Sequence, residues 1–175
     1  MPDIRHILTQ LDKTQRGFLL AADSVAAPRW RQRPQPEAWC AGEIVAHLMM
    51  VEGTIIGKAA QLVRQPPKAV PIWNRAHLPV ILAEWRGVKR RTPIPLDESL
   101  ITEKGTMLSR LREVREKTLA FIRETGDRDL SAYRWPHPFF GSLNLYTWFR
   151  TIAHHEVRHT KQIQEIVAAI RNIQK

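Results

Sequence analysis

Apolar residues recur at every third or fourth position in four stretches of the chain, which is the spacing that places them on one face of an α-helix. The stretches cover residues 4–25, 40–64, 97–125 and 142–173. The alternation of apolar and polar residues that is typical of a strand is not found. The pattern therefore predicts an all-α protein in which four long helices form one domain, residues 1–175.

Prolines and capping residues mark the expected helix ends. Prolines follow the first and the second helix. The other expected boundary residues are Asp97 or Ser99 at the start of the third helix, Gly126 after its end, and Ser142 or Asn144 as N-cap of the fourth. Residues 66–96 form a long connection, with a weak helical pattern over residues 78–85. The expected architecture is a four-helix bundle with a long crossover between helices 2 and 3.

The composition narrows the class of protein. The chain has one cysteine, Cys40, which excludes an internal disulfide and suits a reducing cytosol. Charged residues interrupt the N-terminus where a signal peptide needs an apolar run. No window approaches the ~20 apolar residues of a membrane span. We therefore expect a soluble, cytoplasmic protein without a membrane segment.

The net charge of +10 raises the question of a nucleic-acid partner. The positive residues are dispersed, and the densest run, residues 86–91, lies between prolines in the long connection. Glu113 and Glu116 interrupt the positive positions of the third helix. Solvated surface charge is therefore the preferred interpretation, although the charge also favours an anionic substrate.

Three of the seven histidines interrupt the apolar stripes at inward positions. They are His47 on the second helix and His155 and His159 on the fourth, whereas His154 lies with the polar face. Each could be a structural histidine bound to a carbonyl or a carboxylate. Three convergent imidazoles in a dry core are harder to satisfy in that way, and one shared divalent cation satisfies all of them. Because residues at i and i+4 share a helix face, His155 and His159 can grip one ion, which His47 completes.

Residues 155–159 also read as H-E-x-x-H, the signature of zinc proteases, in which Glu156 would be the general base. The extended signature requires a glycine and a further histidine, and residues 160–165 contain neither. No strands are expected for a protease sheet. A protease is therefore not expected, and Glu156 stays a candidate proton acceptor or a support behind the ligands.

Two stretches of the chain resemble the DinB-like superfamily. One comprises residues 137–144, His-Pro-Phe-Phe-Gly-Ser-Leu-Asn, together with Trp148 and residues 155–163; the other comprises Trp39, Glu43, His47 and Leu48. The resemblance implies an up-down-down-up bundle and a metal site of His47, His155 and His159. It also implies zinc or nickel as the metal and pairing as a homodimer. Cys40 stands where the family often has serine or threonine, which bears on helix capping.

The resemblance also suggests which activities to expect. Members of the family include thiol transferases and a thiol-dependent isomerase, which use mycothiol or bacillithiol, and others are described as metal-dependent hydrolases. We therefore expect a metal-dependent transferase that joins a low-molecular-weight thiol to a small-molecule substrate. In the hydrolase alternative the metal activates water and Glu156 or another nearby carboxylate takes the proton. The third alternative is a non-enzymatic protein that is stabilised by metal or associated with nucleic acid.

Overall fold

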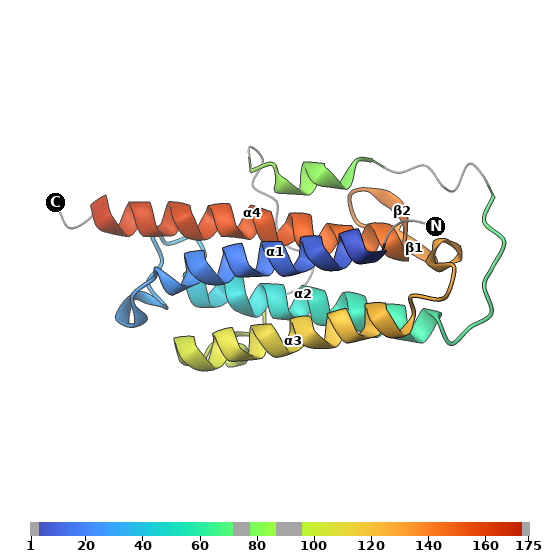
Figure 1. The fold of residues 1–175 in the computed structure, drawn as a ribbon. Coiled ribbons are helices and arrows are strands. Elements are labelled where there is room, and N and C mark those ends of the chain that lie inside the picture. Colours follow the sequence, from blue (N-terminus) through green and yellow to red (C-terminus); the bar gives the residue numbers. More distant parts are fainter. Residues whose placement is uncertain (1–3, 72–77, 87–95, 173–175) are drawn as a thin grey trace.

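Four long helices dominate the computed structural model, which describes residues 4–71, 78–86 and 96–172 (Figure 1). The long helices are α1 (Ile4–Asp23), α2 (Ala41–Leu62), α3 (Lys104–Glu124) and α4 (Leu145–Asn172). The strands are β1 (Arg134–His137) and β2 (Gly141–Asn144), and the short 3-10 helices are η1 (Ala27–Arg29), η3 (Val80–Glu84), η4 (Glu98–Leu100) and η5 (Leu130–Ala132). The expected all-α class is confirmed.

The third helix begins later than the sequence predicts, because a separate 3-10 turn precedes it. The Asp97 carboxylate accepts a hydrogen bond from the Ser99 N–H at 3.0 Å and thereby starts η4, not α3. Ile101 then adopts an extended backbone with φ −82° and ψ 103°. An extended residue interrupts the helical ladder, so α3 starts only at Lys104.

A small antiparallel hairpin, which the sequence analysis did not predict, precedes α4. Trp135 pairs with Leu143 across β1 and β2. Each strand has only four residues and β1 contains Pro136, so the alternation is too short to be recognised. Ser142 is part of β2 and does not cap α4. Asn144 does, because its Oδ1 accepts hydrogen bonds from the N–H and the hydroxyl of Thr147, both at 2.9 Å.

The helices associate mainly as two pairs, α1 with α4 and α2 with α3. Their apolar residues form two buried clusters. Leu11, Ile55, Ile122 and Phe149 belong to one, and Phe18, Ile44, Leu111 and Ile163 belong to the other. Between these positions each helix contributes a polar residue: Thr14, Glu52, Arg115 and Glu156. A polar layer therefore divides the core.

The helical pattern predicted over residues 78–85 is present as η3, which packs on α4. Glu84 contacts His154 Nδ1 at 2.7 Å, and Arg86 pairs with Glu165 of α4 through its Nε at 2.7 Å. Thr151, one turn before His154 on the polar face of α4, is buried. This face was expected to be exposed to solvent, and the crossover partly covers it. Residues 87–91 of the basic run lie outside the described residues.

No helix of the described segments has both the length and the apolar character needed to cross a membrane.

Two glycines give a matched test of the backbone. Gly141 has φ 84°, a left-handed conformation, whereas Gly17 is exposed on α1 and a Cβ there would meet no atom within 4 Å. We expect Gly141→Ala to lower the free energy of unfolding by about 1–2 kcal/mol. Gly17→Ala should raise it by about 0.5–1 kcal/mol, because alanine loses less entropy in a helix. Urea unfolding measures both, and equal effects of the two changes would contradict the assigned conformation of Gly141.

Candidate metal centre

The structure brings three histidines from two helices into one cluster. His47 comes from α2, and His155 and His159 come from successive turns of α4. The Nε2 atom of His155 lies 3.2 Å from that of His47 and 3.0 Å from that of His159. One nitrogen from each ring lies within 4.8 Å of the other two. These are the three residues that the helical register predicted to converge.

Helix periodicity explains why each imidazole faces inward. On α2, His47 follows Ile44 by one turn, and both side chains are buried. On α4, Ile152 and Ile163 are buried on either side of the histidine pair. The i and i+4 spacing of His155 and His159 sets their ring centroids 4.5 Å apart.

The spacing of the nitrogens fits ligands of one small divalent ion. Imidazole nitrogens about 2.0–2.1 Å from a common ion lie about 2.9 Å apart at right angles and about 3.4 Å apart at the tetrahedral angle. The two observed separations, 3.0 and 3.2 Å, fall within this interval. Direct hydrogen bonding does not explain both contacts, because the single Nε2–H of a neutral His155 can donate to only one neighbour.

Two neighbouring side chains hold the rings in place. The Gln162 Oε1 lies 2.9 Å from His159 Nδ1 and can only accept, so His159 carries its proton on Nδ1 and turns the Nε2 lone pair toward the cluster. Trp39, which precedes α2, lies nearly parallel to the His159 ring with centroids 6.3 Å apart. It also packs against His47 at 5.0 Å. Trp39 and Gln162 both lie in the stretches of resemblance described above, but neither was predicted from the sequence to hold the histidines.

Burial keeps the cluster neutral. It lowers the pKa of His47 to about 4 and that of His155 to about 3, and in His155 the nearby His47 adds to the effect. Burial also lowers the pKa of His159 well below its ordinary value. Neutral imidazoles with free lone pairs are the form that binds a metal.

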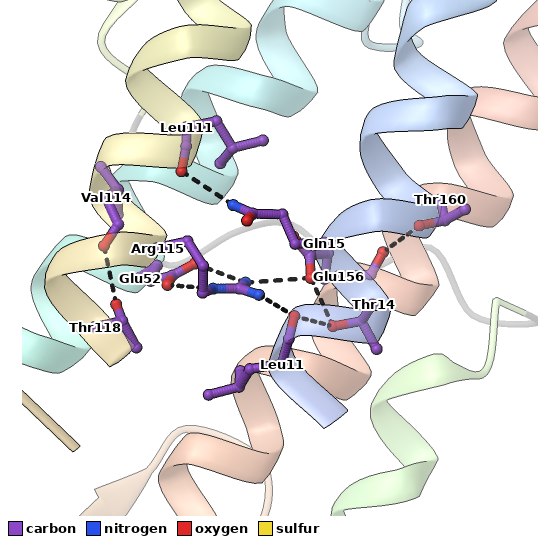
Figure 2. A network of polar contacts seen from close by, with 10 residues as sticks. All are labelled: Leu11, Thr14, Gln15, Glu52, Leu111, Val114, Arg115, Thr118, Glu156 and Thr160. Carbon is purple, nitrogen blue, oxygen red and sulfur yellow. Dashed lines mark hydrogen bonds and ion pairs between the residues drawn. The ribbon is translucent and has the colours of Figure 1, made fainter. Parts of the chain in front are cut away.

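Glu156 does not face the cluster, although it directly follows His155. Its Oε2 accepts a hydrogen bond from the Thr14 hydroxyl at 2.7 Å and contacts Arg115 Nη2 at 3.1 Å, as Figure 2 shows. Burial raises its pKa to about 7, while Arg115 acts in the opposite direction. Among the described residues, the group that satisfies the metal-ligand spacing contains no carboxylate. Glu156 therefore belongs to the polar layer of the core.

His137 lies at the end of β1 beside Trp148 of α4. The two ring centroids are 4.9 Å apart, and His137 also adds to the lowering of the His155 pKa. Its Nδ1 accepts a hydrogen bond from the Phe139 N–H at 3.0 Å, and burial lowers its pKa to about 4. Neutral His137 therefore carries its proton on Nε2. This position of His137 was not predicted from the sequence, because the hairpin that holds it was not recognised.

Comparison with known proteins adds a family assignment. The sequence model of the DinB superfamily matches residues 10–163. A protein of Bacillus subtilis (strain 168), described as uncharacterized protein YuaE, is 32% identical over 136 residues. That alignment covers 77% of this chain and 81% of the relative.

The lowered pKa of His47 predicts a pH dependence of stability in the metal-free protein. Between about pH 6.5 and 4 the unfolded chain takes up a proton that folded His47 does not, so stability falls as the pH falls through this window. From pH 7 to pH 5 the loss from this group is about 2 kcal/mol. Urea unfolding with a chelator present measures this effect. Between pH 7 and pH 5 we expect the free energy of unfolding of the native protein to fall by about 2 kcal/mol more than that of His47→Gln.

Glu156 acts in the opposite direction, since its pKa is raised, but it is common to both proteins and cancels in the comparison. Parallel pH profiles of the two proteins would contradict the neutral buried state of His47.

Proposed function

The chain belongs to the DinB superfamily, and from that premise we propose that it binds one divalent metal ion through His47, His155 and His159. The observation that carries this proposal is the convergence of the three neutral imidazoles at ligand spacing. We propose zinc or nickel as the metal, since imidazole is a suitable ligand of both. Three protein ligands leave positions open for a substrate.

The reaction we propose is transfer of a low-molecular-weight thiol to a small electrophilic substrate. A bound divalent ion supplies Lewis acidity, which lowers the pKa of a coordinated thiol. The chain itself supplies neutral ligands, held by Gln162 and covered on one side by Trp39. Its net charge of +10 favours acidic groups on the thiol or the substrate.

A metal-dependent hydrolase is the second candidate, and the position of Glu156 makes it less favoured. Activation of water calls for a base within hydrogen-bond reach of the water. The Glu156 carboxylate is instead held by Arg115 and Thr14. A thiol is far more acidic than water before it binds a metal, so it has less need of such a base, and this supports the transferase.

We further propose a cytoplasmic location and pairing as a homodimer. Exposed apolar side chains on and beside η3 support the pairing, since Ile81, Leu82 and Trp85 are 59%, 51% and 63% exposed. A non-enzymatic role with nucleic acid rests on the net charge alone. Such a role would require that the protein binds nucleic acid, that this binding weakens as the salt concentration rises, and that removal of metal does not change it.

Metal content tests the site directly. We expect untagged native protein to carry about one equivalent of zinc or nickel in elemental analysis, and the variant His47→Ala/His155→Ala/His159→Ala to carry none. His154→Ala is the matched control, because His154 contacts Glu84 and lies outside the cluster. Native protein that stays metal-free after incubation with zinc, nickel and manganese would exclude the proposed function.

Thiol binding separates the transferase from the hydrolase. We expect cobalt-loaded native protein to develop a sulfur-to-cobalt absorption band when a small thiol such as cysteine is added, and Glu156→Gln to keep that band. The hydrolase would hydrolyse model esters or amides without any thiol and would be inhibited by the added cysteine, and Glu156→Gln would abolish that hydrolysis.

A further inference from the structure

The polar layer inside the core joins all four long helices through one side chain. Arg115 of α3 contacts both oxygens of Glu52 on α2, Glu156 on α4 and the Leu11 carbonyl on α1, as Figure 2 shows. Thr14 of α1 completes the layer by donating to Glu156. Arg115 and Glu156 are 1% exposed and Glu52 is 3% exposed. Any other helix register would leave a buried charge without its partner, which is strongly unfavourable.

The hydrogen bonds of Arg115 and the candidate metal centre both cross the seam between the two helix pairs, α1–α4 and α2–α3. His47 lies in the α2–α3 pair of helices, whereas His155 and His159 lie in the α1–α4 pair. Arg115 binds within its own pair to Glu52, at 2.8 Å through Nε and 3.0 Å through Nη2. It reaches the other pair at Glu156, 3.1 Å away.

The two carboxylates are close to the histidines along their helices. Glu52 follows His47 by five residues on α2, and Glu156 is adjacent to His155 on α4. His155 and Arg115 line the same small cavity. A slip of one residue moves a helix by about 1.5 Å, whereas metal–ligand distances tolerate only about 0.2 Å. The relative position of α2 and α4 therefore decides whether the three nitrogens meet.

We propose that Arg115 is a positioning residue for the three-histidine centre, because it holds Glu52 and Glu156 together and so fixes α2 against α4. This inference rests on the proposed metal binding. The planar guanidinium suits the task, since its fixed fork of donors binds two carboxylates in one geometry, which a lysine ammonium cannot reproduce.

Positioning and stability can be separated by experiment. Replacement of a buried ion network by apolar residues of similar volume often leaves stability unchanged or raises it. A network that serves stability alone could therefore be exchanged without effect on metal binding. A network that positions ligands could not.

The experiment compares cobalt affinity, measured by competition with a chelating dye, and the ligand-field spectrum of bound cobalt. Arg115→Lys keeps the charge and loses the fork, and we expect its affinity to fall by about 10- to 100-fold with an altered spectrum. Glu156→Gln removes a charge and keeps the shape, and we expect a smaller loss. Ile122→Ala, a buried change on the same helix, should lower the unfolding midpoint and keep the native affinity and spectrum.

The proposal would be overturned if Arg115→Lys kept the native cobalt affinity and spectrum. It would also be overturned if Glu156→Gln lost as much cobalt affinity as Arg115→Lys, because the effect would then come from charge. The same loss of affinity in Ile122→Ala would assign the effect to general instability and would overturn it as well. If Arg115→Lys does not fold, the apolar variant Glu52→Leu/Arg115→Met/Glu156→Met takes its place, with the same expected loss and the same overturning result. Absence of cobalt from the native protein would refute the metal site itself, and the positioning role with it.

Discussion

Burial of the Arg115 guanidinium between two carboxylates is the constraint on which the arrangement of the helices depends. Apolar side chains pack in many registers with similar energies, whereas a buried charge has few acceptable partners. Loss of one partner from such a network costs about 3–5 kcal/mol, a large share of the stability of a small protein. Glu52, Glu156 and the Leu11 carbonyl satisfy Arg115 together only when all four helices occupy the observed positions. The network thus selects one packing among several that the apolar clusters would allow.

The histidine cluster inherits its geometry from this packing. His47 reaches the other two ligands only across the seam between the helix pairs, where Arg115 also crosses. Burial keeps the imidazoles neutral, and the Gln162 amide turns the lone pair of His159 inward. The three nitrogens are therefore turned toward one another in the form that binds a cation, and no carboxylate of the described residues joins them at ligand spacing. Such a site favours a substrate that brings its own ionisable group, and this is the physical basis of the thiol transferase that we propose.

The crossover and the hairpin complete the surroundings of the centre. The 3-10 helix η3 covers part of α4, where Glu84 contacts His154 and Arg86 pairs with Glu165. Beside it, the hairpin is bonded to the crossover through the Leu78 N–H and the Phe140 carbonyl. The hairpin places His137 against Trp148, with its Nε2 proton defined by the Phe139 N–H. None of the three contacts at His154, Glu165 and Trp148 involves a candidate ligand, but all of them lie on the helix that carries His155 and His159. The surface next to the centre is thus built by segments outside the four long helices.

The sequence by itself determined the four helices and the inward direction of His47, His155 and His159, because both follow from the 3.6-residue period of a single helix. The sequence also limited the N-cap of α4 to Ser142 or Asn144, since capping is local, and the structure decided for Asn144. The start of α3 was not predicted correctly, because an aspartate can cap either an α-helix or a 3-10 helix. Asp97 caps the 3-10 helix η4, and α3 begins at Lys104. Only the tertiary structure decided that Glu156 turns toward Arg115, that the hairpin forms, and that the crossover covers His154. The hairpin is local but too short to be recognised, whereas the other two outcomes depend on partners that are 41 residues away for Glu156 and 70 residues away for His154. The pattern of one helix carries no information about such distant contacts.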